Sequence, residues 1–523
     1  MKHPALPGCA HCPWHRRRFL SRTPVLAAGV VAALRSSVGA PATADSGVRP
    51  TRIRIVFALH APQQPGPDWP NVGFDFQPVM QRVTDELTRR CPGFAFVTST
   101  ATGPEQARKI LEADTAEGGI DGYVVQQLNC WNQVVQTFAT AGKPVLYADF
   151  QYGGSGGFLV YNAAFLRQRA PNVGFVASSD IRDLAEAVRC FRVLREGGSV
   201  QDFVDATARV RARRTPEPRN PGRGSDDLQC LGADACLGRM KASRILVVRD
   251  QSSGEEPSVA GIPVQRIPFS ELNAAWEQAD PDQSRAVADR WQRTASRIEG
   301  VTRETLETSA AMYLAEKAVL QKHEANAITI NCLGGFYGGH IHAYPCLGFH
   351  QLLSDGLVGG CEADVRSAAT LVIGNLLTGG RPGYISDPVI DTAKRRIIYA
   401  HCVAANKAFG PGGPSNPFEI LTHSEDRQGA SVRSFLPLEQ IVSTLEFDGS
   451  RKEILFHRAW AVANDPDDRA CRTKLCAEPI GDVEKLFTEW DRWGWHRVTF
   501  YGDLEKPMEA LADALGWKLV REA

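Results

Sequence analysis

The stretches TRIRIVFALH (51–60) and FQPVMQRVTDELTRR (76–90) set the pattern from which the fold is predicted. The first is typical of a buried strand, whereas the second places apolar residues at the spacing of an amphipathic helix. Strand-like runs recur at FAFVTST (94–100), GYVVQQL (122–128) and PVLYADF (144–150). Strands that alternate with helices of this length indicate a doubly wound parallel sheet.

A second α/β unit follows an interruption. RARRTPEPRNPGRGSDD (211–227) is rich in Arg, Pro and Gly, and it predicts a linker-like excursion rather than a nucleic-acid arm. SRILVVRD (243–250) and NAITINCL (326–333) then resemble strands of one sheet. Two helices are expected between them, at about 282–298 and 303–323.

Beyond about residue 380 the pattern changes to short β-rich pieces such as RRIIYAHCVA (395–404) and KEILFHRAWAV (452–462). Such pieces, separated by turn residues, indicate an antiparallel, barrel-like domain. We therefore predict an α/β protein with doubly wound domains at 46–178 and 179–378, followed by a β-rich domain at 379–523.

The first 45 residues are predicted to be an export signal. HRRRFLS (15–21) resembles a twin-arginine signal, and VLAAGVVAAL (25–34) after it is too short to span a bilayer. Small residues suited to signal peptidase follow in APATAD (40–45). We therefore expect export to the periplasm or beyond by the twin-arginine pathway, with no integral membrane segment in the mature chain.

Charge and cysteine content narrow the class of protein. The 59 basic and 59 acidic residues give a formal net charge of +0, and no basic patch is interleaved with aromatic residues. Nucleic acid is therefore not an expected partner. The cysteines are scattered rather than arranged as a dense disulfide framework. Cys230 with Cys236, and Cys471 with Cys476, are close enough in sequence to bridge, and spacing leaves both pairings open.

Two carboxylates in GCEADVRSAATLVIGNLLTGGRPGYISDP (360–388) are candidate metal ligands. Apolar residues at three- and four-residue steps predict a helix over 365–377, which ends at two glycines. A helix out and a brief strand back would bring Asp387, at the strand's exit, close to Glu362, leaving Asp364 to cap the helix. Two carboxylates in one pocket require a cation or a shared proton to offset their repulsion.

Two histidines can complete such a site. His401 lies in YAHCVA (399–404), and His496 lies in GWHRVTFYGD (494–503). Each histidine alone is more typical of a satisfied core or edge residue. Together with the carboxylates they make an oxygen-and-nitrogen ligand set of the Mn²⁺ type.

Two other motifs suggest different chemistry. GGSGG (153–157) matches G-x-S-x-G with Ser155 as nucleophile, yet two residues separate it from the preceding strand, which favours a plain glycine loop. In GGFYGGHIHAYPCLGFH (334–350), His340 and His342 on a strand would point to one face, as in some zinc sites. We favour a loop that lines a polar, substrate-contacting pocket, because no partner motif accompanies them.

The stretch YPCLGFHQLLSDGLVGG (344–360), continued by the carboxylate segment, resembles the metal-site region of the L-fucose isomerase and L-arabinose isomerase superfamily. The ending GWHRVTFYGDLEKPMEALADALGW (494–517) is similar to that family's histidine-containing strand and closing helix. The resemblance covers roughly 320–523 at the level of motifs and the upstream domains only in architecture.

The resemblance implies two Rossmann-like domains and a β-rich C-terminal domain, assembled as a homo-oligomer. It implies conversion of an aldose to a ketose through an ene-diol, with Mn²⁺ or another divalent cation as cofactor. Glu362 and Asp387 would be both ligands and acid/base pair, with His496 and His401 as further ligands. Trp131 is expected on the sugar-facing surface.

Three departures from the family keep an alternative open. The family's enzymes are mostly cytosolic, Arg497 stands where relatives often have a second histidine, and the C-terminal domain is short. The main prediction is a metal-dependent sugar ketol-isomerase. The alternatives are a non-catalytic carbohydrate-binding protein on the same fold and, third, a serine hydrolase that uses Ser155.

Overall fold

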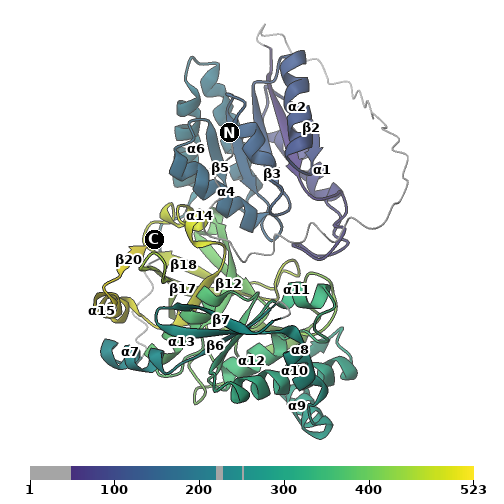
Figure 1. The fold of residues 1–523 in the computed structure, drawn as a ribbon. Coiled ribbons are helices and arrows are strands. Elements are labelled where there is room, and N and C mark those ends of the chain that lie inside the picture. Colours follow the sequence, from purple (N-terminus) through teal and green to yellow (C-terminus); the bar gives the residue numbers. More distant parts are fainter. Residues whose placement is uncertain (1–48, 220–227, 250–251) are drawn as a thin grey trace.

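The computed structural model describes residues 49–219, 228–249 and 252–523. The predicted export signal lies outside the described residues and stays a prediction. Figure 1 shows the first α/β unit, in purple and blue, set above the second unit and the C-terminal sheet, which lie side by side. No helix within the described ranges is both long and apolar enough to cross a bilayer.

The first unit is built on a parallel sheet of five strands in the order β2-β1-β3-β4-β5. Both faces of β1 are buried: Ile53 and Ile55 pack with α1 and α5, whereas Val56 packs on the opposite side. This burial explains the continuous apolar run IVFAL at 55–59. The strands are β1 (Thr51–Ala58), β2 (Phe94–Ala101), β3 (Gly122–Gln127), β4 (Val145–Asp149) and β5 (Val173–Val176). The helices are α1 (Gln77–Arg90), α2 (Pro104–Glu117), α3 (Val134–Ala139), α4 (Ser155–Gln168), α5 (Ile181–Arg189) and α6 (Val200–Arg214).

The second unit has a five-stranded sheet in the order β11-β10-β6-β8-β7, parallel except for the edge strand β7. Its strands are β6 (Ile245–Val248), β7 (Gly254–Val259), β8 (Ile262–Ile267), β10 (Ala327–Ile330) and β11 (Val358–Cys361). Its helices are α7 (Ala233–Lys241), α8 (Phe269–Glu277), α9 (Pro281–Thr294), α10 (Arg303–Lys322), α11 (Cys332–Tyr337), α12 (Cys346–Ser354) and α13 (Val365–Leu377). The bounds of α13 are those predicted from the sequence.

The C-terminal region is a seven-stranded sheet in the order β16-β19-β12-β13-β18-β17-β20. β16, the first strand in this order, also pairs with β17, the sixth. The strands are β12 (Tyr384–Asp391), β13 (Arg396–His401), β16 (Ile441–Asp448), β17 (Glu453–Asn464), β18 (Thr473–Ile480), β19 (Arg497–Tyr501) and β20 (Lys518–Arg521). The helices α14 (Trp490–Trp493) and α15 (Glu505–Leu515) flank β19, and β9 (Arg297–Glu299), β14 (Phe418–Leu421) and β15 (Ser431–Ser434) form a small separate sheet. The predicted combination of parallel α/β units and a β-rich C-terminal region is confirmed.

The structure differs from the sequence-based prediction at one boundary. α5 and α6 were expected in the second domain, but both pack against β5 and the first sheet. The predicted linker at 211–227 begins inside α6, where the buried Arg211 donates to Glu484 and to the Phe175 carbonyl. Arg211 is therefore a buried helical residue rather than part of an exposed basic run.

Two further predictions differ in detail. Asp387 lies in the middle of β12 rather than at a strand's exit, because the strand continues through Pro388 to Asp391. No disulfide forms among the eleven cysteines within the described residues, so neither suggested bridge is present.

Candidate metal centre

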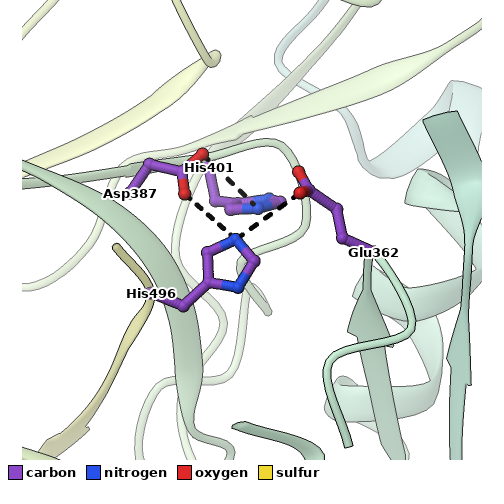
Figure 2. A group of neighbouring side chains, drawn as sticks. All are labelled: Glu362, Asp387, His401 and His496. Carbon is purple, nitrogen blue, oxygen red and sulfur yellow. Dashed lines mark ion pairs between the residues drawn. The ribbon is translucent and has the colours of Figure 1, made fainter. Parts of the chain in front are cut away.

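Four side chains from four separate segments of the chain converge on one point (Figure 2). Each of Glu362, Asp387, His401 and His496 offers one ligand atom, and these atoms all lie within 4.8 Å of one another. These are the four residues that the sequence predicted as metal ligands. Across the described part of the chain, this is the one group of its kind.

Glu362 is positioned by a sharp turn at the carboxyl end of β11. Glu362 and Ala363 both have left-handed backbone, with φ of 64° and 52°. Such a conformation is uncommon for residues with a Cβ and clusters at functional sites. Hydrogen bonds from Ala363 N to the Ile330 carbonyl and from Asp364 N to the Cys361 carbonyl hold the turn. The turn aims the Glu362 side chain away from the second sheet and toward the third.

The other three residues come from neighbouring strands of the C-terminal sheet. β12 lies between β19 and β13, and Asp387 pairs with Ala400, the residue before His401. On the other side Ser386 pairs with Arg497, the residue after His496. Antiparallel register therefore places these three side chains level with one another.

The distances define a compact cluster. His496 Nε2 lies 3.1 Å from Asp387 Oδ1 and 3.8 Å from Glu362 Oε2. His401 Nε2 lies 3.9 Å from Asp387 Oδ2 (Figure 2). Asp387 Oδ1 and both ring nitrogens of His401 are buried and make no hydrogen bond of good geometry with the described residues. Buried polar atoms without partners are rare and require an explanation such as a bound ion.

Asp364 was predicted to cap a helix, and it has a second role. It is the N-cap of α13, accepting from Ser367 N, and its Oδ2 also accepts from His496 Nδ1 at 2.8 Å. A proton on Nδ1 leaves Nε2 turned toward Glu362 and Asp387. This is how a carboxylate outside a metal's ligand set orients a histidine ligand.

Electrostatics separate the two imidazoles. Burial lowers the pKa of His401, against the attraction of Asp387, so its ring is neutral and offers a lone pair. Burial alone would also lower the pKa of His496, but Asp387 and the hydrogen bond to Asp364 raise it well above its ordinary range. Burial alone would raise the pKa of Asp364, but His496 and Arg366 hold it well below its usual range.

The donor set fits a divalent cation. Two carboxylates and two imidazoles are ligands suited to Mn²⁺, Fe²⁺, Co²⁺ or Zn²⁺. The atoms without hydrogen-bond partners belong to two of these four residues, Asp387 and His401. Metal binding would displace the Nε2 proton of His496, which makes affinity increase with pH.

A group of three tryptophans, Trp69, Trp131 and Trp495, lies beside the centre, and only Trp131 was predicted from the sequence. The predicted Trp131 has its ring centroid 6.1 Å from that of Trp495, which in turn lies 4.9 Å from Trp69. Trp495 directly precedes His496, and its Nε1 donates to the Pro388 carbonyl, next to Asp387. The adjacent Trp and His in GWH were the signal that could have identified Trp495.

The structure does not bring the other candidate residues to the cluster. Residues 338–345 form turns rather than a strand, and His340 stacks on Phe269 while His342 lies against Trp276. Both rings therefore lie along α8. Ser155 is fully buried at the start of α4 and donates to Asp149, so it is not an exposed nucleophile.

Parts of the chain are similar to sulfoquinovose isomerases. Identity to the enzyme of Clostridium sp. (strain MSTE9) is 26% over 211 residues, which is 39% of this chain and 46% of that protein. Identity to the enzymes of Priestia aryabhattai and Priestia megaterium (strain ATCC 12872 / QMB1551) is 30% over 117 residues, or 22% of this chain and 26% of each relative.

The similarity thus spans less than half the length of each of these relatives. No protein-family profile matches the chain. The relatives' names give a sugar and an isomerisation, which is the class of activity that the family resemblance implied.

Proposed function

We propose that this protein is a metal-dependent aldose–ketose isomerase whose centre is formed by Glu362, Asp387, His401 and His496. The observation that carries the proposal is the convergence of these four residues, from segments up to 134 residues apart (496 − 362), around buried atoms that make no hydrogen bond of good geometry with the described residues. Partial similarity to sulfoquinovose isomerases supports a sugar as the substrate class. Mn²⁺ is the cation we propose, in line with the family resemblance.

The two carboxylates are assigned different tasks. The Glu362 side chain is 21% exposed, whereas that of Asp387 is 6% exposed and lies between the two imidazoles. Glu362 is therefore the carboxylate that substrate can reach, and Asp387 is a ligand. A divalent cation bound here would polarise O1 and O2 of an open-chain sugar.

Glu362 is the group that moves the proton. It takes the proton from C2 of the aldose, and the electron pair released forms the C1–C2 double bond of an ene-diol as O1 gains a proton. Glu362 then returns its proton to C1 while O2 loses its hydroxyl proton and becomes the ketone oxygen. Asp364 keeps His496 in the orientation that the site requires, by accepting from Nδ1. The tryptophan group excludes water from one side of the centre.

Solvent-isotope exchange tests this proposal directly. The protein is incubated in D₂O with Mn²⁺ and a panel of aldoses that includes sulfoquinovose, and deuterium at C1 of any ketose is followed by NMR. The proposal predicts incorporation that requires metal and disappears in Glu362→Gln. The matched control is Glu439→Gln, because Glu439 is exposed and also has left-handed backbone, with φ of 59°.

The same experiment distinguishes the proposed isomerase from the non-catalytic alternative. A carbohydrate-binding protein with a structural metal would bind both metal and sugar yet incorporate no deuterium from any aldose in the panel. Retained incorporation in Glu362→Gln would remove Glu362 from the proton-transfer role.

A further inference from the structure

A cavity lies at the carboxyl edge of the first sheet. It has a volume of about 390 Å³, within the range of small-ligand sites. The ends of β3, β4 and β5 form its floor, and α1 and the start of α5 form its walls. None of the four centre residues lines it.

The floor of this cavity presents an acceptor that lacks a donor. Gln126 is 4% exposed, and its Nε2 donates to the Asp149 carbonyl at 2.7 Å. Its Oε1 is buried and accepts from no group among the described residues. A buried amide oxygen without a donor is destabilising, so a donor supplied by a bound ligand would be favourable here.

The second floor group is the Asp149 carboxyl. It is 8% exposed, and among the described residues its oxygens accept from the Ser155 hydroxyl at 3.0 and 3.1 Å. The walls are aromatic, since the rings of Phe74 and Phe150 lie 6.3 Å apart. At the rim the Arg469 guanidinium lies 5.3 Å from the centroid of Phe150 and donates to the Gln151 carbonyl.

These groups exclude most ligand classes. An apolar ligand would leave Gln126 Oε1 without a donor, and an anion such as a carboxylate would bring only further acceptors to that oxygen. A cation would meet Arg469 and Arg82, which also lines the cavity. A neutral molecule with several hydroxyls satisfies all of them, because its hydroxyls donate to the floor and its C–H faces pack on the aromatic walls.

We infer that this cavity, formed by Gln126, Asp149, Phe74, Phe150 and Arg469, is a second binding site for a neutral polyhydroxylated molecule of monosaccharide or cyclitol size. The inference does not rest on the proposed isomerase function. β12 runs from the cavity to the metal centre: Asp391 at one end of that strand accepts from Ser179 at the cavity, and Asp387 lies four residues away (391 − 387).

The test uses myo-inositol, which has no carbonyl carbon and therefore cannot be isomerised. Binding to the full chain is measured by saturation-transfer NMR and titration. Val79→Trp fills the cavity from α1, and Gln126→Leu removes the floor acceptor. Gln81→Trp is the matched control, since Gln81 is exposed on the same helix and does not line the cavity.

We expect wild type and Gln81→Trp to bind myo-inositol equally. Val79→Trp is expected to weaken binding by at least roughly ten-fold, and Gln126→Leu by about five-fold, the loss of one net hydrogen bond. Glu362→Gln should bind like wild type. Thermal melts check that each variant is folded. Gln126→Leu changes the floor of the cavity without adding bulk, so the test does not depend on the folding of Val79→Trp.

Two results would overturn the inference. One is the absence of binding to wild type at tens of millimolar. The other is binding that persists in both Val79→Trp and Gln126→Leu, including binding lost only in Glu362→Gln, which would place the ligand at the metal centre. Because Glu362→Gln removes isomerase activity while the cavity variants keep it, failure of this inference and failure of the proposed function are distinguishable.

Discussion

The carboxyl edges of the two parallel sheets carry similar residues in different surroundings. At the first edge Asp149 ends β4, and at the second Glu362 and Asp364 follow β11. Asp149 is buried with a serine hydroxyl as its partner, and burial raises its pKa to about 8. The Asp364 side chain is 20% exposed, and His496 and the start of α13 hold its pKa well below the usual range.

The difference arises from the third sheet. β12, β13 and β19 meet the second edge with two imidazoles, so negative charge there is balanced by groups that can also bind a cation. The first edge meets the far end of β12, where Asp391 is already satisfied by Ser179. A carboxyl at the edge of a sheet therefore favours a proton in one place and a cation in the other, depending on what packs against it.

The largest effect is expected from neutralising the carboxylates of the second edge. Glu362→Gln should lower isomerisation by about 10²–10⁴-fold, because it removes the proton-transfer group. Asp387→Asn should lower metal content as well. Neither variant should destabilise the metal-free protein, since each removes one of two like charges. Metal analysis and melting temperature with and without Mn²⁺ check this, and wild-type metal content and wild-type Mn²⁺-dependent stabilisation in both variants would contradict the metal site.

The next effect concerns pH at the first edge. Because the pKa of Asp149 is raised from 3.8 to about 8, the folded protein binds a proton that the unfolded chain releases, and this contribution is fully present below about pH 4. It is lost as pH rises toward 8, at a slope of up to about 1.4 kcal/mol per pH unit. Asp391 adds to this rise in pKa, whereas Arg469 opposes it.

Asp149→Asn should therefore flatten the decline of unfolding free energy between about pH 4 and 8, measured by urea titration at several pH values. Asp513→Asn is the control, because Asp513 is exposed on α15. An equal slope in wild type and Asp149→Asn would show that Asp149 is ionised in the folded protein.

Local signals made much of the second edge predictable. The 365–377 helix and its glycine stop were read from periodicity, and the 25 residues between Glu362 and Asp387 (387 − 362) are one helix and one strand. Proximity across so short a unit follows from its geometry.

Features that depend on long-range pairing were not predictable in the same way. His401 and His496 could be named as candidates, but their position beside Asp387 depends on the register of three strands from distant segments. α5 and α6 were assigned to the second domain although they pack on the first sheet, because the pattern of an amphipathic helix does not show which sheet the helix covers. His340 and His342 lie in turns rather than on the alternative strand, and their rings lie along α8 instead of reaching the cluster.

A third prediction tests the contact between the two regions. A Cβ on Gly156, in the first turn of α4, would lie 2.5 Å from the Trp495 ring. Gly156→Ala should therefore displace Trp495, beside His496, and lower the unfolding free energy by about 1–3 kcal/mol, as overpacking does. Urea denaturation measures this, with Gly238→Ala as control because Gly238 lies in α7 with open space around its Cβ position. If the two variants are equally stable, the glycines of 153–157 are not needed for close packing.

The smallest predicted effect isolates what the imidazole adds at the second edge. Asp364 and Asp280 are both N-caps that accept from backbone N–H groups, at α13 and α9. Only Asp364 also accepts from a histidine ring of the cluster. Asparagine caps a helix about as well as aspartate, so Asp364→Asn and Asp280→Asn should both leave the unfolding free energy almost unchanged. Asp364→Asn should nevertheless weaken Mn²⁺ binding by about ten-fold, because His496 loses its charged acceptor. This is the low end of the loss seen when the partner of a histidine ligand is removed. Asp280→Asn should not change Mn²⁺ binding. Isothermal titration with Mn²⁺ compares the two variants. If their affinities are equal, Asp364 serves only the helix, and the difference between the two edges depends on Glu362, Asp387 and the imidazoles alone.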